Sequence, residues 1–258
     1  LRQSLGKRYS DHTIDGFVRQ SRQFLGAAGV KEGYTRQDVL AYVDRLIAGG
    51  YRAQSIQTML SGVRALFHAL QLAWPLDRRD MHLGIAPVEP ERPILSLAEV
   101  RELVRAVRGG GGIAEPMMAL ATTYGFRSTE IVSVLGQGLD GSAVEVQTAK
   151  QGHRRTHSVP SRVSRSLTFR PIQISRGSLH YLYESLIKDR IPKSHEGLHA
   201  VRRSLVTELL NRDVPELTVF RFMGWGKAGS MAYHYFRPMQ EKVDAEIFAK
   251  HPYLGFWE

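Results

Sequence analysis

The stretch Tyr124-Gly-Phe-Arg127-Ser-Thr-Glu130-Ile131 lies between two helical patterns near the middle of the chain. Residues 116–124 before it are largely apolar, and residues 128–135 after it predict a second helix. Arg127 and Glu130 are three residues apart, and such a pair is most often an ordinary ion pair on a helix surface. The stretch therefore predicts two helices joined by a short turn at Gly125.

Further helices and one β-hairpin surround this stretch. Ser96 and Glu99 form a capping box that begins a helix with an apolar stripe as far as Val107. Residues 143–150 alternate in polarity as a strand does, and residues 156–159 predict its partner after a turn at Gln151-Gly152. More helices are expected at residues 178–188, 199–211, 217–223 and about 240–250.

The first part of the chain predicts a separate helical unit. Helices are expected at residues 11–25 and 53–72, and between them Thr35 and Asp38 form an imperfect capping box. Pro87, Pro90 and Pro93 then lie within one short segment that cannot be helical and is typical of a semi-rigid linker. We therefore expect one domain at residues 1–86, a linker at 87–93 and a second domain at 94–258.

Composition excludes several classes of protein. The 258 residues include no cysteine, which rules out disulfide scaffolds, thiol catalysis and cysteine zinc sites. His153 and His157 are four residues apart but fall in the expected hairpin rather than on a helix, so no metal site is expected there. No apolar run reaches about 18 residues, so no membrane span is expected, and residues 1–30 contain no secretory signal.

Charge favours a polyanionic partner. The formal net charge is +10, and both expected domains are basic. Between Val146 and Tyr183 there is no Asp or Glu, so this basic stripe is either a solvated surface or a surface that faces phosphates. Its cations are Lys150, Arg154, Arg155, Arg162, Arg165, Arg170 and Arg176.

Four short signals occur in a fixed order along the chain. They are Arg127 with Glu130, Lys150 in the hairpin, His199-Ala-Val-Arg202, and Gly224-Trp225 followed by Tyr235. Each signal alone has an ordinary structural explanation, because His and Arg three apart often share a helix face and a Tyr in an apolar stretch usually packs. Their combination is more informative than any one of them.

Together these signals resemble the tyrosine recombinase (phage integrase) family over about residues 14–248, most densely over 94–238. The resemblance implies a mainly α fold with a small β-sheet. It implies a helical, SAM-like core-binding domain followed by an α+β catalytic domain. It also implies a site-specific recombinase or integrase that cleaves and rejoins DNA through a 3′-phosphotyrosyl intermediate, without a metal or other cofactor.

The resemblance also implies a role for each matched residue. Arg127 and Arg202 would clamp the phosphate, since guanidinium groups stay charged and offer forked donors. Lys150 would protonate the departing 5′ oxygen, and His199 would assist proton transfer at the tyrosine. Glu130 would hold the geometry of the arginine and of His199. Trp225 stands where many members have His, and its indole N–H donates a hydrogen bond but cannot shuttle a proton.

The nucleophile has two candidates. Aligning Ser230 with the family's serine places Tyr235 in register and needs one extra residue in the Gly-containing loop at 226–229. Tyr233 is the alternative and needs a deletion instead. We favour Tyr235, because a Gly-containing loop tolerates an insertion. Either tyrosine suits the reaction, because a phenol is a good enough leaving group for the phosphotyrosyl bond to be reversed.

The expected partner is double-stranded DNA, which the two domains of one chain would clamp from opposite faces. Two to four copies of the chain are expected to assemble on the DNA. The candidate DNA contacts are Arg52, Gln54, Arg64, Arg154, Arg155 and Arg176. The apolar tail at 253–257 is expected to dock on a neighbouring protomer or on its own domain. An intracellular protein is expected, either cytoplasmic and associated with the nucleoid or encoded by a virus or mobile element. The alternatives are an inactive DNA-binding module, or a type IB topoisomerase or telomere resolvase; an RNA-binding role has no supporting motif.

Overall fold

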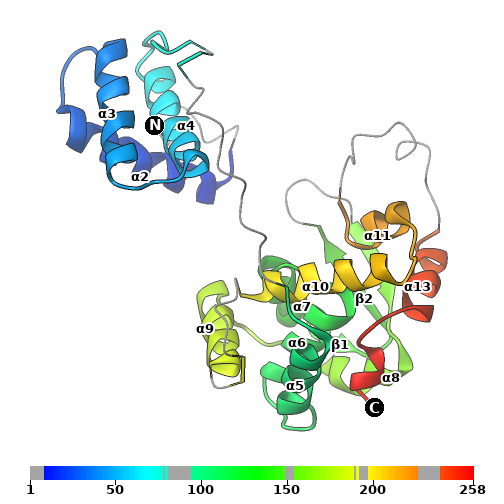
Figure 1. Cartoon of the computed structure of the whole chain (residues 1–258). Helices are drawn as coiled ribbons and strands as arrows, with labels where there is room; N and C mark the ends of the chain where they lie inside the picture. Colours follow the sequence, from blue (N-terminus) through cyan, green and yellow to red (C-terminus); the bar gives the residue numbers. More distant parts are fainter. Residues whose placement is uncertain are drawn as a thin grey trace. The chain divides into compact units, whose positions relative to one another are not determined.

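The computed structural model describes residues 9–77, 79–80, 94–148, 154–188, 190–191, 197–225 and 239–258. The chain divides into two compact units, Leu1–Pro90 and Glu91–Glu258, each with its own hydrophobic core (Figure 1). In the described part of the chain, none of the helices combines the length and apolar character that crossing a bilayer requires.

The described part of the first unit is helical, with α2 (Asp11–Ala28), α3 (Arg36–Ala48) and α4 (Ala53–Ala69). The predicted capping box is present: the Thr35 side chain accepts from the Asp38 N–H, and the Asp38 carboxylate accepts from the Thr35 N–H at 2.7 Å. The helix α4 ends earlier than expected, because the chain turns at Gln71 with a φ of 58°. Apolar faces of all three helices meet in a core around Phe24, Val43 and Phe67.

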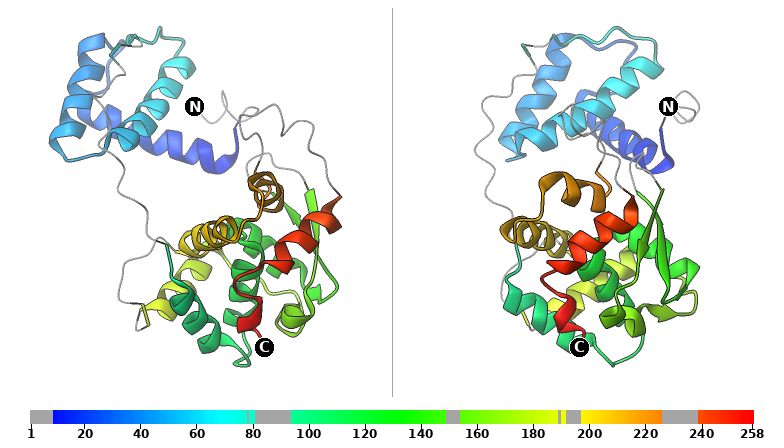
Figure 2. Two further views of the ribbon diagram at one scale, coloured as in Figure 1. Left: turned by 45° about the vertical axis from the view of Figure 1, so that its right-hand side comes forward. Right: turned by 90° about the vertical axis from the view of Figure 1, so that its right-hand side faces the viewer.

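The second unit is built around α6, whose residues from Pro116 to Tyr124 are all buried. Figures 1 and 2 show α6 enclosed by other helices of this unit. The described elements are α5 (Leu97–Val107), α6 (Ala114–Tyr124), α7 (Ser128–Gln137), β1 (Leu139–Asp140), β2 (Ala143–Gln147), β3 (Arg154–Ser158), α8 (Ser161–Ser164), η1 (Arg165–Leu167), β4 (Thr168–Phe169), α9 (Arg176–Ile187), α10 (Leu198–Asn211), α11 (Glu216–Phe222), α13 (Gln240–Ala249) and η2 (Leu254–Phe256).

The predicted hairpin is an antiparallel pair of β2 and β3, with Val144 opposite His157 and Val146 opposite Arg155. These four side chains form the buried face of the hairpin, since alternate residues of a strand point to opposite sides. The hairpin contacts α13 through β3, and α13 lies beside the hairpin in Figure 2. A second, two-residue ladder joins β1 to β4.

The last residues of the chain pack on their own unit. Tyr253 and Trp257 are buried, and the Trp257 indole Nε1–H donates to Thr122 Oγ1 at 3.2 Å. The His251 imidazole is buried beside them, with Nε2 2.9 Å from the Thr123 carbonyl oxygen and Nδ1 accepting from the Tyr253 N–H. Of the two predicted docking modes for this tail, the structure has the one within the same domain.

His251 should make stability depend on pH. Burial lowers the pKa of His251 to about 4. An unfolded His has a pKa near 6.5, so the unfolded chain takes up the proton first as the pH falls. The stabilisation from neutral His251 is thus complete above about pH 6.5 and is lost as the pH falls toward 4. From pH 7 to pH 4.5 we expect this residue to lower the unfolding free energy by about 2–3 kcal/mol.

Urea titrations at both pH values check this effect. The His251→Gln variant, whose amide can still donate to Thr123, should lose less stability on acidification than the unsubstituted chain. The matched control is His180→Gln, which removes an exposed histidine side chain from the same unit. An equal acid-induced loss in the unsubstituted chain and in His251→Gln would assign the effect to another group.

Candidate functional site

Arg127 and Glu130 meet where α6 ends and α7 begins. The Arg127 N–H donates to Glu130 Oε2 at 2.8 Å, and its guanidinium Nη1 donates to Glu130 Oε1 at 2.9 Å. Gly125 makes this junction possible, because its φ is 60° and an added Cβ would lie 2.7 Å from Met223 Cε. The pair is therefore not an ordinary surface ion pair, since the Glu130 side chain is almost fully buried.

Arg202 on α10 reaches the same junction from the other side. Its Nη1 donates to the Gly125 carbonyl oxygen, and its Nη2 donates to the Met223 carbonyl oxygen at 3.0 Å. Arg202 Nη1 also lies 3.8 Å from Glu130 Oε2. Burial, and next repulsion by Arg127, lower the pKa of Arg202 to about 9, which leaves the guanidinium charged at neutral pH.

Two arginines distant in sequence thus converge on one buried carboxylate. The Arg127 guanidinium bonds one oxygen of Glu130, and the Arg202 guanidinium lies near the other. One carboxylate offsets only one of the two positive charges, so the cluster keeps a net positive charge. The Arg127 side chain is 20% exposed and the Arg202 side chain 5% exposed. The cluster can therefore attract an anion that approaches from the Arg127 side.

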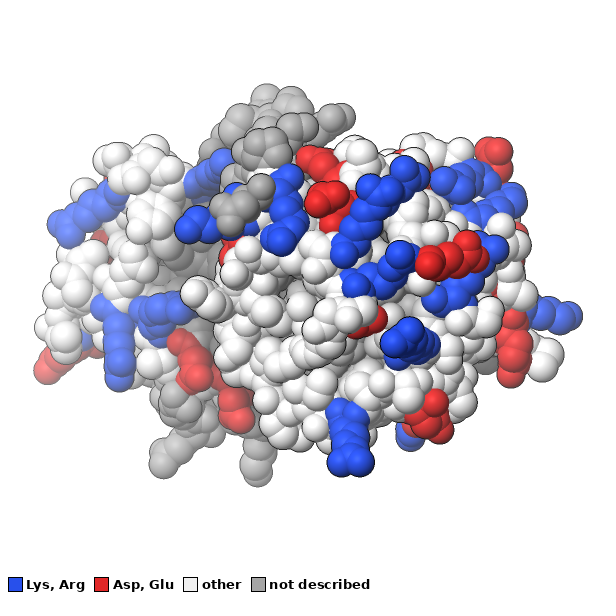
Figure 3. Space-filling model, turned by 90° about the horizontal axis from the view of Figure 1, so that it is seen from below, with Lys and Arg blue, Asp and Glu red and all other residues white. Residues whose placement is uncertain are grey.

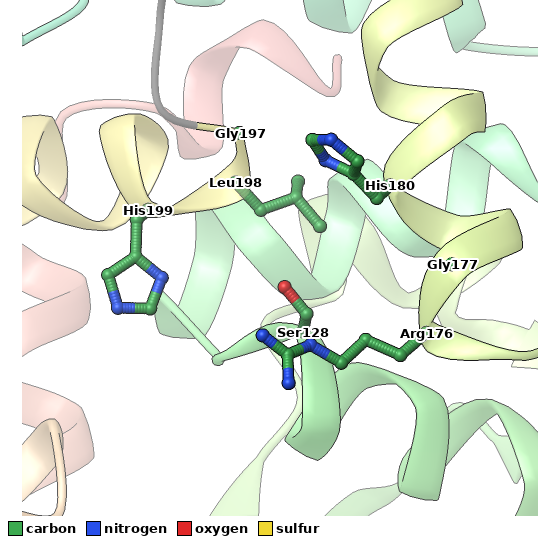
Figure 4. A pocket seen from close by; sticks show the side chains of 7 residues that line it. All are labelled: Ser128, Arg176, Gly177, His180, Gly197, Leu198 and His199. Atoms are coloured by element: carbon green, nitrogen blue, oxygen red, sulfur yellow. The ribbon is translucent and has the colours of Figure 1, made fainter. Parts of the chain in front are cut away.

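His199 lies on the first turn of α10, three residues before Arg202, and is exposed. It lines a hollow of about 470 Å³ together with Ser128, Arg176, Gly177, His180, Gly197 and Leu198. Figure 4 shows His199 on α10 and Arg176 on α9 lining it from different walls, with Ser128 between them. Because Ser128 directly follows Arg127, this hollow adjoins the arginine pair.

Trp225 completes the part of the site that the structure describes. It follows Gly224, which has a φ of 66° and lies so close to Arg155 that an added Cβ would be 2.6 Å from its Cζ. The Trp225 N–H donates to the Phe220 carbonyl oxygen at 3.0 Å. The Arg202 Cζ is 5.5 Å from the Trp225 ring centre, so the indole contacts the arginine cluster directly.

Three predicted catalytic positions fall outside the described residues. They are Lys150, in the segment 149–153 between β2 and β3, and both candidate nucleophiles, Tyr233 and Tyr235, in the segment 226–238. Their roles stay predictions. The structure brings together Arg127, Glu130, Arg202 and Trp225, with His199 on the adjoining hollow.

The predicted DNA contacts occupy different environments. Arg52, Gln54 and Arg64 belong to the exposed surface of α4 and the residue before it. Arg176 is exposed and lines the hollow beside His199. Arg155 was predicted to contact DNA at the surface, but it is buried, with an exposed fraction of only 7%. The reason is strand alternation, which turns Arg155 inward opposite Val146.

The predicted basic stripe is not one uninterrupted phosphate-facing surface. Arg154 forms an ion pair with Glu145 across the hairpin, and Arg162 pairs with Glu258. Arg165, Arg170 and Arg176 are exposed. On the face drawn in Figure 3, basic side chains are interspersed with acidic ones. Counting charges along the sequence therefore overstated the positive charge of this surface, because acidic residues from other segments pair with its arginines.

Sequence reasoning missed two features of this unit. One is His180, which lines the hollow from α9 beside Arg176. The other is a buried network in which Arg155 and His157 on β3 meet Asp244 on α13. A signal for it existed, since Asp244 interrupts an otherwise apolar helix face next to Val243 and Ile247. Its partners are more than 80 residues away in sequence, which no local pattern reveals.

Comparison with known proteins agrees with this architecture. Residues 4–73 match the phage integrase N-terminal SAM-like domain. No curated protein matches the chain in sequence. This match confirms the predicted SAM-like domain in the first unit. Solved integrase structures share the mainly helical fold of the whole chain, which confirms the predicted fold.

Three solved structures illustrate the similarity in fold. A lambda integrase dimer bound to a COC′ core site has a TM-score of 0.66 at 17% identity, covering 91% of this chain and 92% of that one. The integrase of the transposon Tn1549, in complex with transposon right-end DNA, has a TM-score of 0.58 at 14% identity, covering 96% of each chain. The integrase from mycobacterium phage Brujita has a TM-score of 0.52 at 21% identity, covering 99% of this chain and 95% of that one.

Proposed function

We propose that this chain is a tyrosine-type site-specific DNA recombinase that cleaves and rejoins strands without a metal. The observation that supports this most is the convergence of Arg127 and Arg202 on the buried Glu130, beside a hollow that His199 lines. A recombinase-like fold alone would not carry the proposal, since one fold hosts many functions. The cluster supplies what phosphoryl transfer needs, namely fixed positive charge at a phosphate.

The proposed reaction is a reversible exchange of phosphoester bonds. The Tyr235 oxygen attacks the phosphorus, the bond from phosphorus to the 5′ oxygen breaks, and Lys150 protonates that oxygen as it leaves. Arg127 and Arg202 stabilise the charge on the non-bridging oxygens, and His199 accepts the tyrosine proton. Rejoining runs the same steps in reverse from a DNA 5′ hydroxyl. Trp225 adds an indole N–H donor near the phosphate.

The two units would act as two halves of a DNA clamp. The domain at residues 1–86 would bind the core of the target site, and the domain at 94–258 would bind and cut it, joined by the linker at 87–93. Two of the integrases compared above, those of lambda and of Tn1549, are bound to DNA, and the lambda integrase is a dimer. By extension, the present chain would assemble as a dimer to tetramer on double-stranded DNA. It would act inside the cell, or be encoded by a mobile element.

Trapping the covalent intermediate tests the proposal. The probe is a pool of nicked duplexes with a randomised sequence around the nick, incubated with the full chain and a metal chelator. The short strand released by cleavage diffuses away, so a protein–DNA adduct should survive denaturation, and sequencing the trapped DNA should reveal the target site. Binding without an adduct would instead indicate an inactive DNA-binding module. Relaxation of supercoiled DNA without four-way junctions would indicate a topoisomerase.

The affinity of this protein for DNA should fall steeply as the salt concentration rises, and a phosphate contact by Arg176 should account for part of that dependence. Most contacts in such complexes are to phosphates, so each neutralised phosphate steepens the dependence of log K on log salt. Arg176→Ala should reduce that slope by about 1. Arg154→Ala should reduce it less, because Arg154 is already paired with Glu145. Fluorescence anisotropy of the recovered duplex over a salt series measures both, and equal slopes for Arg176→Ala and the unsubstituted chain would refute the contact.

A further inference from the structure

A network of buried polar side chains connects α13 to the end of α11. Asp244 Oδ1 lies 2.9 Å from His157 Nδ1, and His157 Nε2 lies 3.1 Å from Arg155 Nη1. Arg155 in turn donates to the Phe222 carbonyl oxygen and to Thr148 Oγ1. His157 and Asp244 are almost fully buried, with exposed fractions of 0% and 1%. We call these three residues the Arg155–His157–Asp244 network.

The hydrogen bonds determine the tautomer of His157. A guanidinium can only donate, so His157 Nε2 must accept from Arg155. The proton of the neutral ring then sits on Nδ1 and is donated to Asp244. Burial, the largest influence, lowers the pKa of His157 although Asp244 opposes the shift, which agrees with a neutral ring. Asp244 also accepts from the Ser158 N–H at 2.8 Å, which fixes its carboxylate against β3.

The network ends at the turn that supports the candidate site. Arg155 binds the Phe222 carbonyl oxygen, and Arg202 binds the next one, that of Met223. These are among the last carbonyls of α11, which lack partners within the helix and carry partial negative charge. The following residue, Gly224, packs directly on the Arg155 side chain. A shift of Arg155 would therefore move the backbone that orients Arg202 and Trp225.

Stability alone does not explain this network. The ring centres of Tyr124, Phe126 and Phe222 lie 5.2, 5.9 and 5.0 Å from that of His157. An apolar side chain would suit such surroundings, and replacing buried charged groups by apolar ones is often neutral or stabilising. The network provides a fixed hydrogen-bond geometry, which an apolar side chain could not provide.

We propose that Arg155, His157 and Asp244 are positioning residues that hold the end of α11 in the conformation in which Arg202 and Trp225 receive the phosphate. None of the three is required to touch DNA. The inference rests on the proposed recombinase function, because it assigns the network a role in that reaction.

Two substitutions of His157 test the proposal in the full chain, with the duplex recovered from the randomised pool as the probe. His157→Leu removes both hydrogen bonds and places an apolar side chain among the aromatic rings. His157→Gln keeps one acceptor for Arg155 and one donor for Asp244. In His157→Leu we expect an unchanged DNA Kd and a lower unfolding midpoint, because Arg155 and Asp244 stay buried and each loses a partner. Single-turnover adduct formation by the folded variant should be slowed about 10- to 100-fold. His157→Gln should restore most of the rate.

Other outcomes overturn the proposal. A rate for His157→Leu equal to that of the unsubstituted chain would refute it, as would a parallel loss of DNA binding and rate. If His157→Leu does not fold, Asp244→Asn, which keeps the size of the side chain, is judged by the same criterion. Nitrogen-15 NMR of labelled histidine at neutral pH should show a proton on Nδ1 of His157, and a proton on Nε2 would refute the network. If the unsubstituted chain itself forms no adduct, the proposed function fails first.

Discussion

Arg202→Met is expected to reduce strand cleavage by about 100- to 1000-fold, the loss typical when a preorganised donor to a transition state is removed. The Gly125 and Met223 carbonyl oxygens would lose their donors, and Glu130 would lose one of its two arginines. Because one partner of a buried charged cluster is removed, we also expect the unfolding free energy to fall by about 3–5 kcal/mol. Single-turnover adduct formation and urea titration measure the two effects separately.

A neighbouring arginine provides the control for this substitution. Arg203 is the next residue on α10 and is less buried than Arg202, so Arg203→Met removes the same charge from the same helix. It should leave cleavage within a few-fold of the unsubstituted chain. If Arg202→Met folds, binds the duplex and still cleaves within tenfold of the unsubstituted rate, the clamp assigned to Arg127 and Arg202 is wrong.

Tyr235→Phe is expected to remove the covalent adduct completely while leaving DNA affinity unchanged. The phenol oxygen is the proposed attacking atom, and a ring without it cannot form the bond to phosphorus. Tyr233→Phe is the matched control, because it removes a hydroxyl two residues away and should still form the adduct. Denaturing gels of the trapped complex measure both variants. The reverse pattern would make Tyr233 the nucleophile, and adducts from both variants would exclude each of them.

Local signals predicted the elements of the fold well. The capping boxes at Thr35 and Ser96 are both present, and the helices after them begin where these residues indicate. Such signals work because the partners are three residues apart and the hydrogen bonds form within one turn. The β1–β4 ladder was missed, because two residues per strand are too few to show alternation and the pairing depends on contacts between distant segments.

The candidate site was predicted only in part, for the same physical reason. The order of the motifs indicated that Arg127, His199 and Arg202 belong together, but not that Glu130 would be shared between the arginines. Arg155 shows the limit most clearly. A count of charges along the sequence treats every arginine as exposed, whereas β3 turns this one inward to partners on α11 and α13. Burial of a cation depends on partners that only the fold brings close.

Because α6 is buried on every side, local unfolding should rarely disrupt the candidate site. Proteins open locally at their edges far more often than they unfold as a whole. The Gly125 carbonyl oxygen that binds Arg202 directly follows the last residue of this enclosed helix. Fraying at the rim of the second unit therefore leaves that attachment in place. The arginine cluster should come apart only when the whole unit opens.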